Sequence, residues 1–348
     1  MAAALTLSAA AVLAGMRSFT AIAGWVCDVS PATLERLYQR CGLPARMPSR
    51  STLWRVLTGA DAASVDQAVG AWLAAQYAAT APGGHASTVA QALMVDGKTL
   101  RGAVDTGGHQ AHLLAAATHH HALVLAQAEV GTKTNEIPMF SKVLDGLDIT
   151  GLTVTADALH TQRSHATYLH GRDADFVFMV KDNQPNLFTA LDRLDWPSVP
   201  IAHISDDRGH GRIENRTIQV MPAPADLPFP HVNQVFLVER GVTDLHGRPV
   251  SNVAIFGVTS LPADRADPPT IAQLVRGQWG IESLHWIRDT LYREDQSTTR
   301  TRNGPRVMAA LRNLAIGALR LAGRNDITEA TRWATRDMTR PFTVLGLS

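Results

Sequence analysis

The sequence predicts a mixed α/β fold in which helices flank a sheet and a strand-rich insertion interrupts the pattern. Three observations support this prediction. Short apolar runs alternate with helical patterns up to about residue 200, strands alone follow from about 200 to 262, and both ends of the chain are helical. With 348 residues, 45% of them hydrophobic and 18% charged, the chain can build a packed core and about two domains.

The first 80 residues are predicted to be helical. Apolar residues recur at three- and four-residue spacing over 51–57 and 63–77, and Ser49 or Ser51 can cap the first of these helices. The apolar residues 2–16 fit either a secretory leader or a core helix. No basic residue precedes them and Arg17 interrupts the run, which favours the core helix. Such an apolar start is also typical of a shortened N-terminus.

Strands and helices then alternate behind a Pro/Gly linker at 81–85. Predicted strands are 90–95, 111–118, 122–130, 152–155 and 176–180, and predicted helices are 135–147 and 160–171. His119, His120 and His121 fall between two of the strands, where a hairpin turn is expected. Adjacent strand residues point to opposite faces, so at most His119 and His121 can share a metal. The strand-only region contains 216–220, 235–239 and 253–259, and residues 270–348 are helical.

Composition excludes several classes of protein. Two cysteines, Cys27 and Cys41, are too few for a disulfide scaffold or a multi-cysteine metal site. No apolar run of about 18 residues lacks a charge, so a membrane span is not expected. Residues 89–269 carry a net charge of −6 and residues 270–348 carry +5. This distribution fits a cation-binding centre beside a polyanion-binding surface, and it also fits an ordinary enzyme with a solvated arginine-rich helix.

Two aspartates follow predicted strands. Asp96 and Asp157 each stand at the C-terminal end of a short apolar run, where α/β proteins tend to place their sites. Aspartate is disfavoured inside strands, so two at matching positions suggest a shared role. The alternative is that each caps a turn or a helix, as Asp-Gly pairs commonly do.

A third acid, Glu282, lies in the predicted helix 270–294. Trp279 and Trp286 fall on the same stripe, which predicts that the stripe is partly buried. A buried glutamate needs a partner, and an arginine would serve as well as a metal. If the three acids converge, their oxygens suit Mg²⁺ or Mn²⁺, and two such ions can catalyse phosphodiester cleavage.

Six motifs in order carry a family resemblance. They are "VDGKTLRGA" (95–103), "KTNEIP" (133–138), "TADALHTQ" (155–162), "DFVFMVKDNQPNL" (175–187), "HGRIENR" (210–216) and "WGIESLHWIRDTLYRED" (279–295). Together they resemble the ISAs-type, H-repeat-associated insertion-sequence transposases, which are DDE transposases with an RNase H-like fold. Residues 18–78 also resemble the helical segment that precedes the catalytic domain in this family.

The resemblance implies the domain boundaries and the chemistry. It implies a helical N-terminal segment over 1–80, an RNase H-like catalytic domain over 89–321 with a β insertion at about 200–262, and a helical tail over 322–348. Asp96, Asp157 and Glu282 would be the catalytic and metal-binding triad, with two Mg²⁺ or Mn²⁺ ions. The activity would be DNA cleavage at transposon ends and strand transfer to target DNA, by a cytoplasmic bacterial homodimer in a synaptic complex, with no membrane partner.

Nine residues are candidate DNA contacts. They are Lys98, Arg101, Lys181, Asn183, Gln184, Arg212, Arg276, His285 and Arg288. The alternative for Lys98 and Arg101 is an ordinary ion pair, and the alternative for Arg212 is a solvated turn. Related transposases carry a Tyr-Arg-Glu-Lys signature whose Tyr, Arg and Lys would fall near Val275, Gln278 and Asp289, and these three residues do not match it. Arg276, His285 and Arg288 are therefore proposed as DNA contacts in their place. The ISAs-type family also commonly has His where this chain has Gln278. The arginines at 300, 302, 306, 312, 320 and 324 form either a DNA-binding face or a solvated one.

Two other functions fit the same residues. One is a decayed transposase that still binds DNA but no longer cleaves it. The other is a metal-dependent nuclease without strand transfer.

Overall fold

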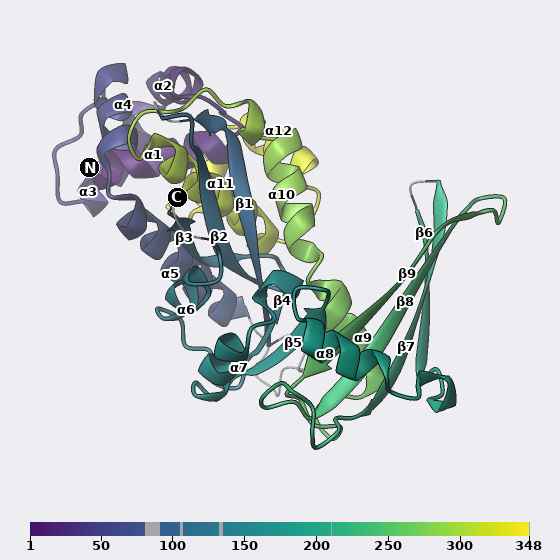
Figure 1. The fold of residues 1–348 in the computed structure, drawn as a ribbon. Coiled ribbons are helices and arrows are strands. Elements are labelled where there is room, and N and C mark those ends of the chain that lie inside the picture. Colours follow the sequence, from purple (N-terminus) through teal and green to yellow (C-terminus); the bar gives the residue numbers. More distant parts are fainter. Residues whose placement is uncertain (81–90, 105–106, 132–134, 210, 348) are drawn as a thin grey trace.

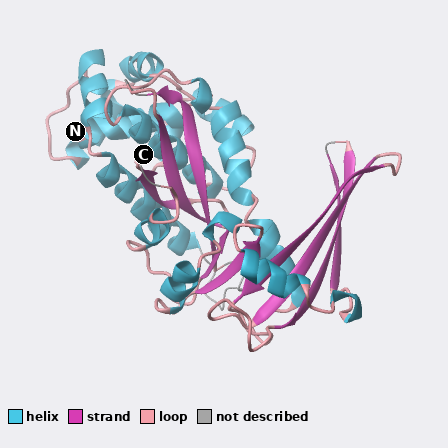
Figure 2. Cartoon of the chain, in the orientation of Figure 1, coloured by secondary structure: helices cyan, strands magenta, loops and turns pink. Residues whose placement is uncertain are grey.

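The computed structural model describes residues 1–80, 91–104, 107–131, 135–209 and 211–347. The predicted linker at 81–85 lies outside these residues. One sheet of nine strands organises the fold, in the order β3-β2-β1-β4-β5-β9-β8-β7-β6, with helices packed against it (Figures 1 and 2).

Five strands form the central half of the sheet. They are β1 (Ala92–Val104), β2 (Gln110–Thr118), β3 (Val124–Val130), β4 (Thr153–Ala156) and β5 (Asp175–Val180). The first three are antiparallel neighbours, and β4 and β5 run parallel to β1. This mixed sheet of order β3-β2-β1-β4-β5 has the RNase H-like arrangement, so the predicted fold class is confirmed. The histidines at 119–121 form the β2–β3 turn, as predicted.

The remaining strands form a long extension, which we call the β arm (residues 203–259). It contains β6 (His203–Gly209), β7 (Arg212–Pro222), β8 (Gln234–Asp244) and β9 (Pro249–Thr259). Strand β9 pairs antiparallel with β5, so the arm continues the central sheet and then projects away from the body (Figure 1). The sequence predicted three of these strands. It missed β6, because this outer strand is largely polar and lacks an apolar run.

The N-terminal helices cover one face of the sheet. They are α1 (Ala2–Leu13), α2 (Phe19–Cys27), α3 (Pro31–Arg40), α4 (Arg50–Gly59) and α5 (Ala62–Thr80). The Ser49 hydroxyl caps α4, as predicted. Helix α1 is buried against α11 (Gly304–Leu321), and α5 packs on α11 and β3. The apolar start of the chain is therefore core, and one apolar cluster joins these helices to the sheet.

Helices on the other face pack around Phe140, Phe176 and Phe178. They are α6 (Met139–Leu144), α7 (Arg163–His170) and α8 (Pro185–Asp192), with 3₁₀ turns at η1 (Ala158–His160) and η2 (Trp196–Ser198). The predicted helix 135–147 is shorter than expected, because Pro138 occupies its N-cap and a helix cannot readily continue through proline.

The predicted helix 270–294 is broken. It consists of α9 (Pro268–Gly277) and α10 (Gly280–Thr290), followed by η3 (Glu294–Gln296), and the chain ends with α11, α12 (Ile327–Thr335) and α13 (Arg340–Val344). Two glycines flank the break, and glycine is a poor helix former. Within the described ranges, no helix has both the length and the apolar character needed to cross a membrane.

Candidate active site

The three predicted carboxylates line one cavity of about 700 Å³, bounded by the ends of the central strands, the α9–α10 junction and the β arm. The parallel pairing of β1 with β4 ends with Val95 opposite Ala156, so Asp96 and Asp157 follow side by side. Asp157 ends β4, as predicted. Asp96 does not end its strand, because β1 continues to Val104 as the partner of β2. Only the parallel pairing of β1 with β4 ends before Asp96, at Val95.

Asp96 sits in a strongly acidic environment. Burial raises its pKa to about 7, the Gly97 backbone N–H partly offsets that rise, and the nearby carboxylates of Asp157, Glu136 and Glu282 add to it. A buried carboxylate beside other carboxylates is unfavourable unless a proton or a cation neutralises it. Asp96 therefore marks the place where a cation would be bound most favourably.

Asp157 and Glu282 are exposed to the cavity. One Asp157 oxygen accepts a hydrogen bond of 3.0 Å from the Leu159 backbone N–H, so the predicted capping alternative does occur, but it uses only that oxygen. Glu282 forms no ion pair within the described part of the chain, so the arginine partner considered as its alternative is not found there. Its place in the first turn of α10 favours a negative charge.

The Glu282 stripe is partly buried, but not at its tryptophans. His285 and Asp289 are 14% and 31% exposed, whereas Trp279 and Trp286 are 52% and 65% exposed. The buried residues of α10 are Ile281, Leu284 and Arg288.

The donor set fits a hard divalent cation. Carboxylate oxygens are the preferred ligands of Mg²⁺ and Mn²⁺, and the uncompensated negative charge around Asp96 favours such an ion. Across the described ranges, no three His, Cys, Asp or Glu side chains already gather tightly enough to hold one ion. Asp96, Asp157 and Glu282 thus offer the oxygen donors that such an ion prefers, along one cavity.

A fourth acid, Glu136, lies beside the site and was not among the predicted site residues. Its oxygens accept hydrogen bonds from His112 Nε2 (2.7 Å) and His160 Nε2 (3.1 Å). Burial alone would raise the pKa of Glu136, but these two hydrogen bonds outweigh it and hold the pKa at about 2. Glu136 lies within the motif at 133–138, yet no spacing pattern distinguished it. Only the fold brings it beside Gly97.

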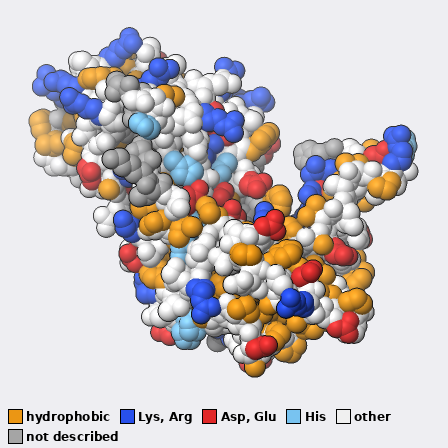
Figure 3. All heavy atoms as spheres, viewed as in Figure 1, with side chains coloured by type: hydrophobic (Ala, Val, Ile, Leu, Met, Phe, Trp, Pro, Cys, Tyr) orange, Lys and Arg blue, Asp and Glu red, His pale blue; other side chains and the backbone are white. Residues whose placement is uncertain are grey.

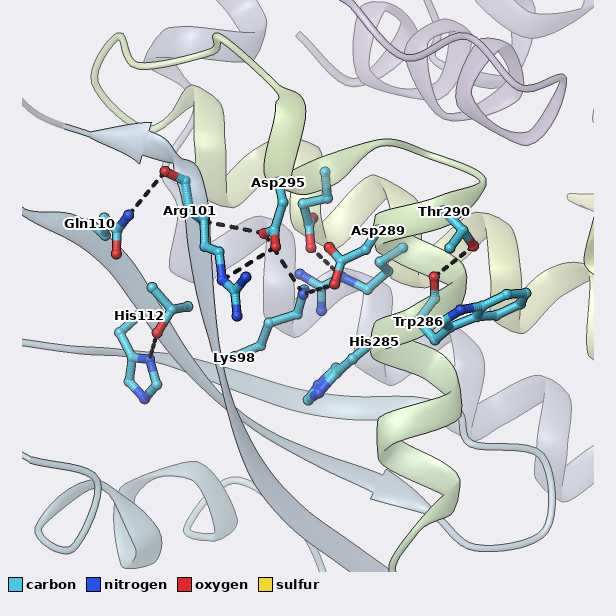
Figure 4. A network of polar contacts seen from close by, with 12 residues as sticks. Lys98, Arg101, Gln110, His112, His285, Trp286, Asp289, Thr290 and Asp295 are labelled. Carbon is cyan, nitrogen blue, oxygen red and sulfur yellow. Dashed lines mark hydrogen bonds and ion pairs between the residues drawn. The ribbon is translucent and has the colours of Figure 1, made fainter. Parts of the chain in front are cut away.

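An ion network docks α10 onto β1 (Figure 4). Lys98 Nζ lies 2.6 Å from Asp289 Oδ2 and 3.9 Å from Asp295 Oδ1, and the lysine side chain is only 8% exposed. Arg288 is 1% exposed and pairs with Glu294 at 2.7 Å. Lys98 and Arg288 were predicted as DNA contacts. In the structure Lys98 forms the ion pair considered as its alternative, and Arg288 is likewise buried against a carboxylate.

His285, another predicted DNA contact, lies beside Asp96. Its ring lies 3.7 Å from Asp96 and its side chain is 14% exposed. Burial is the main reason that its pKa falls to about 3, with further lowering by Arg288 and Lys98. The ring is therefore neutral near pH 7 and stands beside the carboxylate, where it offers no positive charge to DNA.

The basic rim of the cavity contains three of the predicted DNA contacts, Lys181, Arg212 and Arg276. Arg212 is half exposed and pairs with Glu214, and Arg276 is half exposed and pairs with Asp207. Two further arginines of the β arm, Arg216 and Arg240, also line the cavity and were missed. In Figure 3, acidic side chains gather in the hollow between the body and the base of the arm.

The other predicted DNA contacts lie around the site. Arg101 is 77% exposed and lies near Asp295. Asn183 Nδ2 donates to the Ala158 carbonyl oxygen at 2.6 Å, which ties the loop after β5 to the turn after Asp157. Gln184 hydrogen-bonds Gln162 from the same loop.

Most of the C-terminal arginines are held within the protein. Arg306 pairs with Asp66 and Glu129, and Arg312 pairs with Glu294. Arg320 donates to the carbonyl oxygens of His121 and Ala122, and Arg324 lies over the Trp333 ring and pairs with Glu329. These four arginines therefore form neither the predicted DNA-binding face nor the predicted solvated face. Arg300 and Arg302 are exposed.

Comparisons with known proteins match nearly the whole chain. The family described as transposase DDE domain matches residues 88–317, and the family described as DDE_Tnp_1-associated matches residues 1–73. "Putative transposase YncI" of Escherichia coli O157:H7 is 26% identical over 334 residues, covering 91% of this chain and 81% of the relative. "H repeat-associated putative transposase YhhI" of Escherichia coli (strain K12) is 26% identical over 335 residues, covering 90% and 83%. A solved piggyBac transposase synaptic complex with hairpin DNA has a TM-score of 0.44 at 12% identity, covering 99% of this chain and 73% of that one.

Proposed function

The chain belongs to the transposase DDE domain family, as its resemblance implied, and from this premise we propose that it cleaves transposon ends and joins them to target DNA. Asp96, Asp157 and Glu282 are the proposed catalytic triad. The observation that carries the proposal is that these acids, distant in the sequence, line a single cavity with a basic rim. We assign the catalytic domain to residues 89–321 with its β insertion at about 200–262, the helical segment to 1–80 and the tail to 322–348.

The proposed metal ligands are the same three carboxylates. Bound there, two Mg²⁺ or Mn²⁺ ions would supply an activated nucleophile and charge stabilisation for the leaving oxygen of a phosphodiester. The carboxylates anchor the ions, and neutralisation of the Asp96 environment contributes to binding.

The rim holds the DNA in this proposal. Lys181, Arg212 and Arg276 line the cavity and would bind phosphates of the DNA, and positioning is the main contribution a protein makes to such chemistry. Arg101, Asn183 and Gln184 stay predicted contacts. The homodimer stays a prediction of the resemblance.

The test is cleavage of a duplex that carries the terminal inverted repeats flanking the reading frame. We expect nicking that requires Mg²⁺ or Mn²⁺, followed by joining of the new 3′ end to a target plasmid. Asp157→Asn and Glu282→Gln should each lower the cleavage rate by at least about a hundredfold.

The outcomes separate the alternatives. Equal cleavage by Asp157→Asn would remove that residue from the triad. DNA binding without cleavage by the unmodified protein would identify a decayed remnant, and cleavage without joining would identify a nuclease.

A further inference from the structure

One side chain connects the three segments that carry the triad. Gln278 stands at the α9–α10 junction and lines the same cavity as the carboxylates. Its Nε2 donates to the Val95 carbonyl oxygen at 3.0 Å, and its Oε1 accepts from the Thr155 hydroxyl at 2.5 Å. Both polar ends of the amide are therefore used inside the protein.

Each contact lies close to a carboxylate in sequence. Val95 directly precedes Asp96, Thr155 lies two residues before Asp157, and Gln278 lies four residues before Glu282. A shift of Gln278 would consequently move α10 relative to the ends of both strands.

A buried histidine completes the chain of hydrogen bonds. His119 Nε2 lies 2.8 Å from the Thr155 hydroxyl, and because that hydroxyl donates to Gln278, we assign the ring nitrogen as the donor. The His119 backbone N–H donates to the Ala92 carbonyl oxygen at 3.0 Å. The ring packs directly against Gly277, where a Cβ would lie 2.1 Å from Nδ1. Burial lowers the pKa of His119 to about 4, which agrees with a neutral ring that donates from Nε2.

We propose that Gln278 is a positioning residue that sets Glu282 against Asp96 and Asp157. The proposal rests on the proposed function of that triad. A carboxamide suits the task because it donates to a carbonyl and accepts from a hydroxyl at once. It also adds no charge beside three acids. A glutamate in the same place would have no N–H for Val95, and a methionine would make neither hydrogen bond.

The test compares Gln278→Met and Thr155→Val with two controls. Gln219→Met also removes two hydrogen bonds from a glutamine to backbone carbonyls, those of Trp196 and Val199, but Gln219 does not line the cavity. Thr155→Ser keeps the hydroxyl. Single-turnover cleavage of the terminal-repeat duplex in Mn²⁺, its dissociation constant and the melting temperature are measured for each variant.

We expect Gln278→Met and Thr155→Val to lower the cleavage rate by about 10- to 100-fold, with DNA affinity changed less than about twofold. The double variant should be no slower than Gln278→Met, because both changes remove the same hydrogen bond between Thr155 and Gln278. Thr155→Ser should recover most of the rate. Gln219→Met should lower the melting temperature without slowing cleavage. Wild-type rates in both Gln278→Met and Thr155→Val would overturn the proposal.

Hydrogen exchange of residues 275–285 separates this proposal from the proposed function. Gln278→Met should speed exchange there more than Gln219→Met does. If the unmodified protein does not cleave DNA, the proposed function fails, and exchange still decides whether Gln278 holds the junction. Unchanged exchange in Gln278→Met would overturn that role.

Discussion

Asp96 illustrates how a single residue combines two demands. Its position inside β1 places it next to Asp157, and β1 continues beyond it as the partner of β2, which leaves the Asp96 side chain 25% exposed. Burial and the neighbouring carboxylates together raise its pKa to about 7. The ionised Asp96 carboxylate is therefore unfavourable in the metal-free protein, and a bound cation of the kind we propose would relieve that repulsion.

This raised pKa predicts how stability depends on pH. An acid whose pKa is higher in the folded chain than the ordinary 3.8 holds its proton more tightly when folded, so stability falls as pH rises from about 4 to about 7. In EDTA at pH 8, we expect Asp96→Asn to be more stable than wild type by about 1 to 3 kcal/mol, with little difference at pH 4. Denaturant unfolding at the two pH values measures this.

The control is Asp148→Asn. Asp148 accepts hydrogen bonds from Thr150 that lower its pKa, so this substitution should change the stability at pH 8 in the opposite direction to Asp96→Asn. Asp96→Asn stability equal to wild type at pH 8 would contradict the acidic repulsion described for the site.

Gly277 supports a second prediction for a single residue. Its missing side chain lets the His119 ring pack against the end of α9. Gly277→Ala should push the ring away and lower the free energy of unfolding by about 1 to 3 kcal/mol in a denaturant titration. Gly146→Ala is the matched control, since a Cβ there meets nothing within 4 Å. Equal stability of the two variants would show that the His119 ring can move aside without a loss of stability.

Among the elements, α10 depends on buried charge. Glu294 is 1% exposed and binds both Arg288 of α10 and Arg312 of α11. Burial alone would raise the pKa of Glu294, but the two guanidinium groups outweigh it and hold the pKa at about 2. Together with the Lys98–Asp289 pair, this network fixes α10 to the sheet (Figure 4).

Removing the Glu294 charge should therefore be costly. Glu294→Gln leaves two buried guanidinium groups without their anion, and we expect a loss of about 3 to 5 kcal/mol in the free energy of unfolding. Glu329→Gln is the control, because Glu329 forms an exposed pair with Arg324 that should contribute about 0 to 1 kcal/mol. Urea denaturation compares them, and equal losses would show that the buried network adds nothing.

At the scale of the whole molecule, the β arm adds its own residues to the cavity that the carboxylates line. Residues of β6, β7, β8 and β9 line this cavity together with residues of α9 and α10. The arm also carries most of the basic rim.

The rim should determine the salt dependence of DNA binding. Replacing both Arg212 and Arg276 by alanine should reduce the slope of log K against log salt by about 2, since each arginine neutralises about one phosphate. Arg193→Ala, an exposed arginine outside the cavity, should leave the slope unchanged. Titrations of terminal-repeat DNA at several salt concentrations measure this. An unchanged slope in the double variant would exclude the rim as the phosphate-binding surface.

The sequence by itself determined most of the strands, the helical ends, the β insertion and the family, because apolar periodicity and ordered motifs are local. It also predicted the triad of Asp96, Asp157 and Glu282, and these three residues line one cavity. The tertiary structure decided what each charge contacts. Lys98 and Arg288 proved to be buried partners of acids on other elements, whereas Arg216 and Arg240 proved to line the cavity. Ion pairing and burial depend on which distant segments meet, and no local pattern in the chain records that.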